Sequence, residues 1–182
     1  DISATKISDF GGTWGGMNGI PGCTAASYQQ IPVIASDDAG GAVIFWYDTR
    51  SSGAVYGQRM SSIGNAKWAA DGIVIGAVGG ASYPQSAVSD GAGTVYVGWI
   101  SMNYTTWVYS AYAQKVSRAG VVEWQAPGFA FSSGEGEQPG LQLEILQDQD
   151  VLVEAAQRLV DGARHGQADG RLEQHRALAA PR

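Results

Sequence analysis

The sequence predicts an all-β chain built from a repeated unit of four short strands. Tryptophans recur at intervals of 54 and 56 residues, at Trp14, Trp68 and Trp124. Prolines recur at intervals of 52 and 55 residues, at Pro32, Pro84 and Pro139. A period of about 50 residues indicates that one supersecondary unit is repeated along the chain. Apolar runs between clusters of Gly, Asp, Ser and Asn indicate strands joined by tight turns.

Alignment of the copies divides the chain into four parts. Residues 1–30 match the second half of a unit, 31–82 and 83–138 are full units, and 139–182 form an atypical tail. The strands expected in the two full units are, in chain order, 31–35, 42–47, 54–61 and 73–76, then 84–88, 94–100, 108–117 and 129–132. The segments Asp37–Gly41 and Asp90–Gly93 are typical of hairpin turns.

The second strand of each unit has an unusual apolar pattern. Residues 43–47 and 95–97 are continuously apolar, whereas a strand with one face in water alternates between apolar and polar residues. A continuous run indicates burial on both faces of the sheet. The third strand, 54–61, alternates in part, so we expect it to be more peripheral.

Four strands in each repeat, with one strand buried on both faces, are typical of a β-propeller blade. A β-sandwich does not require such a long repeat, and a parallel β-helix has much shorter rungs, so the propeller is preferred to both. The sequence therefore predicts a partial β-propeller of about two and a half four-stranded blades. A closed propeller has about 4–8 blades. We expect further blades or self-association to cover flat sheet faces that carry Ile44, Trp46, Tyr96 and Trp99.

The repeated motifs resemble those of a known group of proteins. In the first full unit the matching stretches are 32–50, 55–59, 64–68 and 71–75, and in the second they are 84–99, 112–115, 120–124 and 128–131. These motifs resemble the repeats of large secreted bacterial β-propeller proteins. The resemblance implies a propeller fold and a secreted or cell-surface location, but no particular ligand. Residues 9–14, DFGGTW, are similar in part to the Asp-box turn, in which an aspartate bonds turn amides.

The tail after Pro139 has a different composition. Residues 140–182 contain no aromatic residue and are rich in good helix formers. Asp150 could cap a helix over about 151–161, and a second helix could cover 169–179. Three interpretations stay open: a helical appendage, a disordered tail, or an out-of-frame translation of the missing blade.

Composition excludes several classes of function. The net charge is −6 and no basic patch is present, which argues against a nucleic-acid partner. No apolar run is long enough to span a membrane. Cys23 is the only cysteine, which excludes an intrachain disulfide and a cysteine metal cluster. We interpret it as a small buried apolar residue and not as a reactive thiol.

No catalytic or metal-binding constellation stands out. The only histidines, His165 and His175, lie in the tail, so a Ser-His-Asp mechanism is excluded in the repeats. The acidic pairs Asp37–Asp38 and Glu135–Glu137 are more typical of turns than of a glycosidase. No cofactor is predicted, although Asp-rich turns could supply oxygen ligands for calcium.

Two small groups of residues are the candidates for binding. Tyr104 and Trp107 lie in a loop that is inserted in the second unit, and exposed aromatic rings can stack on sugars or anchor proteins. The alternative for Trp107 is that it extends the core of the third strand. Asp48 and Arg50 follow the buried strand of the first unit, where they could contact a ligand. The preferred interpretation of this second pair is an ion pair within the unit.

These patterns lead to two hypotheses for the function. The first is a non-catalytic β-propeller segment of a secreted or cell-surface protein that serves as a binding or scaffold module for a carbohydrate or protein ligand. The alternative is a fragment of a sialidase-like, glycan-processing propeller enzyme whose catalytic residues lie outside this chain. A sialidase needs three converging arginines, and the repeats contain only Arg50, Arg59 and Arg118.

Overall fold

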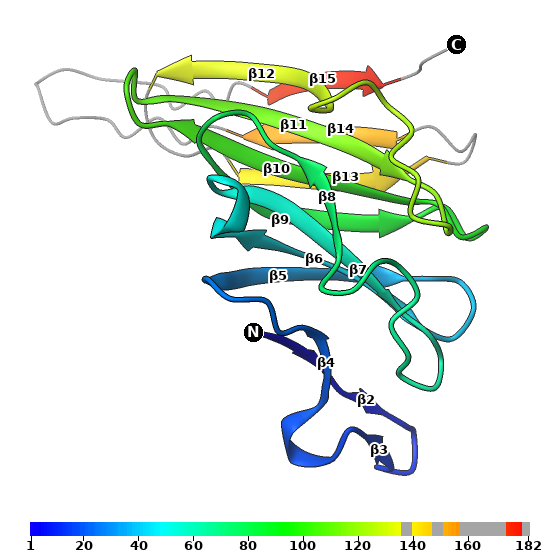
Figure 1. Ribbon diagram of the computed structural model, residues 1–182. Helices are drawn as coiled ribbons and strands as arrows, with labels where there is room; N and C mark the ends of the chain where they lie inside the picture. The colour runs from blue at the N-terminus through cyan, green and yellow to red at the C-terminus, as the bar shows by residue number, and fades with distance from the viewer. Residues whose placement is uncertain (136–139, 147–150, 157–173, 180–182) are drawn as a thin grey trace, which may run out of the picture.

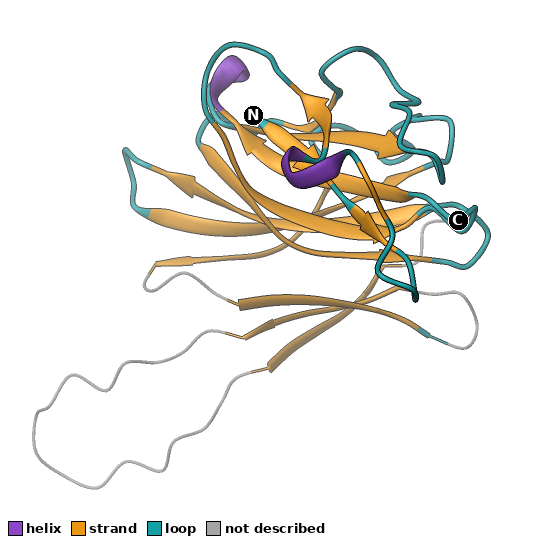
Figure 2. Ribbon diagram, turned by 90° about the horizontal axis from the view of Figure 1, so that it is seen from below, coloured by secondary structure: helices purple, strands orange, loops and turns teal. Residues whose placement is uncertain are grey.

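A computed structural model describes residues 1–135, 140–146, 151–156 and 174–179 of the chain. This part of the chain is all-β, with antiparallel sheets and two short 3-10 helices, η1 (Gly16–Asn18) and η2 (Thr49–Ser51). In Figure 1 the N-terminal segment and the two four-stranded sheets follow one another from the bottom of the view to the top, and the three-stranded sheet of the tail overlaps the second four-stranded sheet. A view turned by 90° shows the strands of successive sheets in layers, with loops gathered at their ends (Figure 2).

Each predicted full unit forms one four-stranded antiparallel sheet in simple chain order. The first sheet consists of β5 (Gln29–Ser36), β6 (Ala42–Asp48), β7 (Ala54–Met60) and β8 (Ile73–Gly76). The second sheet consists of β9 (Ala81–Ser89), β10 (Val95–Asn103), β11 (Val108–Val116) and β12 (Phe129–Glu135). The eight strands agree with the ranges that the repeat predicts.

The N-terminal segment forms two small two-stranded sheets. Strand β1 (Ile2–Ala4) pairs with β4 (Ile20–Cys23), and β2 (Lys6–Ile7) pairs with β3 (Thr13–Trp14). Cys23 ends β4 and is buried, and burial raises the pKa of its thiol. This location agrees with the interpretation of Cys23 as a small buried residue.

Residues 9–14 are the turn and second strand of the hairpin formed by β2 and β3, and a serine bonds this turn. The Ser8 hydroxyl accepts from the Gly12 amide at 2.9 Å. Equivalent bonds join the Asn65 amide to Ser61 at 3.0 Å and the Val121 amide to Ser117 at 3.1 Å. A serine three residues before each turn glycine is therefore a shared feature of the three copies, which the sequence comparison overlooked.

The buried strands of the two units behave as predicted, but the third strand does not. All but two of the residues in β6 are buried, as are the first seven residues of β10. Strand β7 was expected to be peripheral, and this was wrong, since only Arg59 is less than fully buried. It lies between β6 and β8 in the sheet, and further layers pack on its two faces.

The prediction of a helix over 151–161 was wrong for the residues that the structure describes. Strand β13 (Gly140–Ile145) pairs with β14 (Val151–Ala156), which pairs with β15 (Gln174–Ala179). The second helix, predicted over 169–179, is likewise replaced by β15 over its described part. Residues 157–173 lie outside the described part of the chain. The physical reason is that residues 151–156 pair along their length with β13, in which Leu141 and Leu143 are buried and Gln142 and Glu144 are exposed.

Three apolar clusters hold the layers together. One lies between the two four-stranded sheets, one joins the second sheet to β13 and β14, and one joins the N-terminal segment to the first sheet. The expectation that Ile44, Trp46, Tyr96 and Trp99 lie on uncovered faces was wrong, because all four are buried. The N-terminal segment covers Ile44 and Trp46, the tail covers Tyr96, and Trp99 packs between the two large sheets.

Candidate functional site

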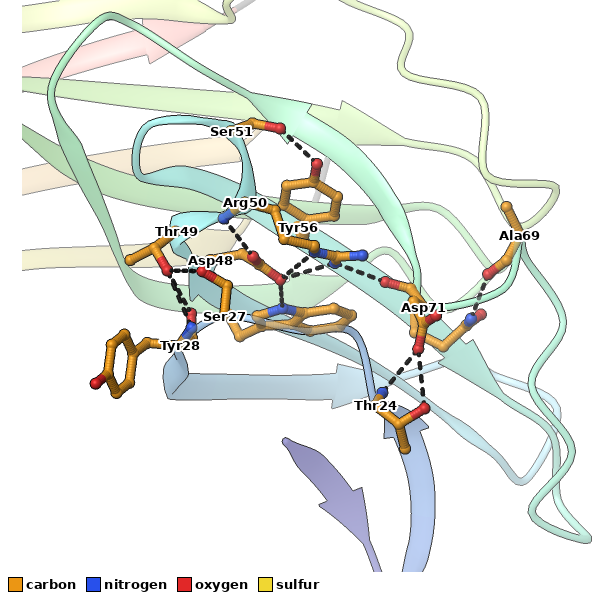
Figure 3. A network of polar contacts seen from close by, with 12 residues as sticks. Thr24, Ser27, Tyr28, Asp48, Thr49, Arg50, Ser51, Tyr56, Ala69 and Asp71 are labelled. Atoms are coloured by element: carbon orange, nitrogen blue, oxygen red, sulfur yellow. Dashed lines mark hydrogen bonds and ion pairs between the residues drawn. The ribbon is translucent and has the colours of Figure 1, made fainter.

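The four predicted site residues occupy two different places. Asp48 and Arg50 belong to a polar network between the first sheet and the N-terminal segment (Figure 3). Tyr104 lines a surface groove at one end of the second sheet. Trp107 lies on the same loop as Tyr104 but is not among the groove-lining residues.

Asp48 is a fully buried acceptor at the end of β6. Its carboxylate accepts from the Trp46 indole Nε1 at 2.9 Å and from the Arg50 backbone amide at 2.9 Å. The Arg50 guanidinium donates to the same carboxylate from Nε at 2.9 Å and from Nη2 at 2.7 Å. Burial raises the pKa of Asp48, but the bonds from Arg50 and Trp46 outweigh this effect, so the pKa lies below its usual value.

Arg50 extends the network toward the N-terminal segment. Its guanidinium lies 4.2 Å from the centre of the Tyr56 ring and donates to the Asp71 carbonyl at 2.8 Å. The Asp71 carboxylate in turn accepts from the Thr24 amide at 2.7 Å, so four chain segments meet here (Figure 3). The ion pair between Asp48 and Arg50 that was preferred from the sequence is present. Because it links the first sheet to Asp71 and, through Asp71, to Thr24 of the N-terminal segment, we call it the Asp48–Arg50 clamp.

The acidic pair Asp37–Asp38 is also committed to protein contacts. Asp37 accepts from the amides of Ala39 and Gly41 and forms an ion pair with Arg59 at 2.9 Å. Asp38 accepts from the Ser89 hydroxyl at 2.7 Å and from the Gly93 amide at 2.9 Å, which ties the turn of the first sheet to that of the second. Both carboxylates therefore have structural roles. Asp37 bonds its own turn and Arg59, and Asp38 connects the turns of the two sheets.

The groove has a volume of about 850 Å³ and crosses the ends of three sheets. Its described lining combines phenol rings, primary amides and apolar side chains, and no charged residue is among these described lining residues. The residues come from β5, β9, β10, the loop after β10, β11 and β13: Gln30, Ile31, Tyr83, Gln85, Met102, Tyr104, Tyr109 and Gly140.

Tyr83 is the central polar group of the groove. Its hydroxyl lies 3.0 Å from that of Tyr104, and its ring centre lies 4.8 Å from that of Tyr47. Burial and the contact with Tyr104 raise the pKa of Tyr83, and burial raises that of Tyr47. Both phenols are therefore neutral at physiological pH and keep their hydroxyl protons for hydrogen bonding.

Ile31 lies at one wall of the groove in an unusual backbone conformation. Its φ is +56°, and the pairing of β5 with β6 shifts register between Gln30 and Val33. A β-branched residue in the left-handed region is a genuine outlier, and such strain costs on the order of 1–3 kcal/mol. The bulge leaves the Ile31 side chain 45% exposed.

Trp107 is 65% exposed and therefore does not extend the core of the third strand. Its amide donates to the Asn103 carbonyl at 2.8 Å, and the Asn103 side chain accepts from the amides of Thr105 and Thr106. These bonds fold the inserted loop into a compact turn that carries Tyr104 at the groove.

Several groove residues were not predicted from the sequence. Gln30, Tyr83 and Gln85 are distant in the chain from Tyr104, and only the sheet packing brings them together, whereas Tyr109 follows Tyr104 across the β10–β11 hairpin. A signal did exist, because the second unit reads Tyr83-Pro84-Gln85 where the first reads Ile31-Pro32-Val33. A change from apolar to hydrogen-bonding residues at repeat-equivalent positions indicates a role that the repeated unit itself does not require.

The three arginines of the repeats do not converge on one point. Arg50 pairs with Asp48 at one end of β6, whereas Arg59 pairs with Asp37 at the opposite end. Arg118 donates to the Ala92 carbonyl at the turn of the second sheet. Within the described residues, a sialidase-like arginine cluster is therefore absent.

The described residues contain no helix that is long and apolar enough to cross a membrane. They also contain no group of three or more His, Cys, Asp or Glu side chains that could hold a metal ion. In comparisons with known proteins, no family model, no curated protein and no solved structure matches this chain.

Proposed function

We propose that this chain is part of a β-propeller in a secreted or cell-surface protein, and that it is a non-catalytic module that binds neutral carbohydrate. The observation that carries the binding proposal is the groove, in which Tyr83, Tyr104 and Tyr109 stand beside Gln30 and Gln85 and the described lining residues are all uncharged. The propeller and the location rest on the repeat and on its resemblance to secreted propeller proteins.

The sheet arrangement supports the propeller part of the proposal. Both full units are four-stranded antiparallel sheets in simple order, as blades are. The first strands of successive units, β5, β9 and β13, contact one another in sequence. Such contacts are expected where the strands at one edge of each blade surround a common axis.

The chemistry of the groove matches that of a sugar ring. A pyranose has an apolar face of C–H groups, which packs on aromatic rings, and an edge of hydroxyl groups that both donate and accept hydrogen bonds. Phenol and amide groups also both donate and accept, so they complement the hydroxyl groups of a sugar.

The absence of charge among the described lining residues of the groove favours a neutral ligand. A sugar carboxylate would lose hydration on entry and would find no cation among the lining residues. Arg50 and Arg59 are held in ion pairs elsewhere. The net charge of −6 further disfavours an acidic sugar, because like charges repel.

The experiment is a glycan array with the full chain, followed by isothermal titration with the best neutral ligand. Tyr104→Ala should weaken binding about tenfold or more, as expected for an aromatic contact residue. Tyr28→Ala is the matched control, because Tyr28 is 76% exposed and is absent from the groove lining.

Three outcomes would contradict the proposal. Equal loss in both variants, or in neither, would place binding outside the groove. A preference for sialylated or uronic-acid glycans would contradict the neutral specificity. Turnover of a glycoside would favour the alternative of a glycan-processing enzyme.

A further inference from the structure

The first strand of each large sheet contains a bulge, and both bulges bring a side chain to the groove. In β9 the shift of register leaves Gln85 without a partner residue in β10. In β5 the shift between Gln30 and Val33 leaves Ile31 and Pro32 without partners in β6. Ile31 and Gln85 both line the groove. A bulge turns a side chain out of the regular alternation of a strand and is common beside functional sites, so these two residues are the first candidates for ligand contacts.

Ile31 occupies its bulge in a conformation that suits other residue types better. Its φ of +56° lies in the left-handed region, and the following Pro32 restricts its backbone further. Apart from Ile31 and Trp107, the described non-glycine residues with a positive φ are serines and aspartates. The Ile31 side chain stays 45% exposed, so packing in the core does not explain an isoleucine at this position. Strained residues of this kind are concentrated at binding sites, where the side chain itself is needed.

Gln85 presents a hydrogen-bond acceptor at the second bulge. Its Nε2 group donates to the backbone carbonyls of Tyr83 and Pro84, at 3.3 Å in each case. These bonds hold the side-chain amide beside its own strand. In the part of the chain that the structure describes, no group donates to the Gln85 Oε1 atom, which leaves this oxygen available to a donor on a ligand.

We propose that the bulge residues Ile31 and Gln85 form a subsite for an acetamido group, so that the groove selects N-acetylated neutral sugars over simple hexoses. This inference rests on the proposed carbohydrate function and names the class of sugar. An acetamido group carries a methyl group beside an amide N–H. The apolar side chain of Ile31 complements the methyl group, and the Gln85 Oε1 atom complements the N–H donor.

The two bulges lie beside the phenols that would contact the sugar ring. Strands β5 and β9 contact each other, so their bulges are on neighbouring strands. Gln85 follows Tyr83 by two residues, and the Tyr83 hydroxyl lies 3.0 Å from that of the exposed Tyr104. A sugar ring stacked on Tyr104 therefore lies within one groove with both bulge residues.

The same arrangement disfavours a simple hexose. A hexose carries a hydroxyl group where the N-acetylated sugar carries its acetamido group. That hydroxyl would lose hydration against the apolar Ile31 side chain without gaining a partner from it. A deoxy sugar with a methyl group would contact Ile31 but would offer no N–H donor to Gln85.

The test compares two disaccharides that share their ring and linkage and differ in the acetamido groups, N,N′-diacetylchitobiose and cellobiose. Both are titrated calorimetrically against the full chain and against Ile31→Asn, because asparagine tolerates the left-handed region but lacks the apolar side chain. The matched control is Ile34→Asn. Ile34 lies on the same strand, is 62% exposed and is not among the described lining residues.

The wild-type chain should bind N,N′-diacetylchitobiose about tenfold more tightly than cellobiose, as one buried methyl group and one hydrogen bond together predict. Ile31→Asn should lose this difference but keep cellobiose binding, and Ile34→Asn should keep both. Gln85→Met, which removes the amide, should also reduce the difference. In saturation-transfer NMR spectra, the acetyl methyl protons should receive strong saturation from the wild-type chain and little from Ile31→Asn.

Stability separates a lost contact from a damaged fold. The urea midpoint of Ile31→Asn should equal or exceed that of the wild-type chain, because the substitution relieves an unfavourable backbone conformation. Ile31→Gly relieves it further and is the second variant if Ile31→Asn fails to fold. It should show the same loss of selectivity.

The inference is overturned if the wild-type chain binds both disaccharides equally, or if Ile31→Asn or Gln85→Met keeps the full difference. Tighter binding of a deoxy sugar than of N,N′-diacetylchitobiose would also overturn it. Cellobiose binding that is lost in Tyr104→Ala would in each case still support the groove. Failure of every neutral sugar to bind the wild-type chain would overturn the proposed function together with the acetamido subsite.

Discussion

The indole Nε1 of Trp46 donates to the carboxylate of Asp48 at 2.9 Å, two residues further along the same buried strand. The same carboxylate accepts from the Arg50 guanidinium, so the buried Trp46 is bonded directly to the Asp48–Arg50 ion pair. Through Asp71 and Thr24, the clamp also reaches the N-terminal segment. The Asp48 side chain therefore supports both the buried Trp46 and the bonds that link the first sheet to the N-terminal segment.

Asp48→Ala should lower the free energy of unfolding by about 2–4 kcal/mol. The change leaves the Trp46 indole buried without an acceptor and removes the partner of Arg50. Urea denaturation followed by tryptophan fluorescence measures the loss. Asp9→Ala, at an exposed position, is the control and should change stability by less than about 0.5 kcal/mol. Equal stability of the two variants would contradict the structural role of the clamp.

The stability of the fold should decrease in acid. Burial raises the pKa of Asp37, Asp48 and Asp90, but their hydrogen bonds outweigh it and hold each pKa below the ordinary 3.8. The unfolded chain therefore binds more protons than the folded chain in this range, and stability is lost as the pH falls from about 4 through the folded values.

The measurement for this prediction is the urea midpoint as a function of pH. The wild-type midpoint should be nearly constant around neutral pH and should fall below about pH 4. Asp37→Asn should make the urea midpoint fall less steeply as the pH decreases, because it removes one carboxyl group whose pKa is lowered in the folded state. An unchanged slope in this variant would show that Asp37 does not contribute.

Tyr83→Phe should destabilise the protein by about 0.5–1.5 kcal/mol, because Tyr104 loses its hydrogen-bond partner at the groove. The raised pKa of Tyr83 keeps its hydroxyl neutral in the folded state. The contribution of Tyr83 to stability is therefore complete below pH 10.0, the ordinary pKa of a tyrosine, and decreases as the pH rises above that value. Tyr28→Phe, at an exposed side chain, is the control.

Absorbance titration of the phenols provides a second measurement for Tyr83. The wild-type chain should contain a tyrosine that ionises well above the ordinary pH range, and Tyr83→Phe should remove that component. Its persistence in the variant would assign it to another residue.

Leu141→Ala should loosen the tail from the second sheet. Leu141 is 2% exposed and lies so close to Gly98 that a Cβ at that glycine would collide with its Cδ2 atom. Loss of a buried leucine costs about 2–5 kcal/mol. Limited proteolysis should therefore cleave the tail of Leu141→Ala faster than that of the wild-type chain, and Gly98→Ala should have a similar effect.

The control for the tail is Glu144→Ala, because Glu144 is exposed on the same strand. Its cleavage rate should match that of the wild-type chain. If Leu141→Ala were cleaved no faster than this control, packing of β13 on the second sheet would not protect the tail.

The tail also shows where composition misleads. Its Ala, Gln, Leu and Glu content favours a helix by intrinsic propensity, which amounts to only tenths of a kcal/mol for each residue. Burial of Leu141, Leu143 and Val151 against the second sheet contributes more, about 1.5–3 kcal/mol for each fully buried large apolar side chain. The alternation of Leu141, Leu143 and Ile145 was a visible strand signal. The hypothesis of an out-of-frame tail concerns the gene and stays a prediction.

The sequence by itself determined the strands of the two full units and the burial of β6 and β10 on both faces. This succeeded because strand patterns and turn residues are local, and a repeat displays each of them more than once. The Asp48–Arg50 pair was also predictable, since its members are two residues apart.

Only the tertiary structure decided how the layers cover one another and where the groove lies. Gln30, Tyr83, Tyr109 and Gly140 meet there although they are far apart in the chain. Their meeting depends on how three sheets stack, which no local pattern encodes. For the same reason, Tyr104 was identified as a candidate from the sequence, whereas its partner Tyr83 emerged only from the packing of the loop on β9.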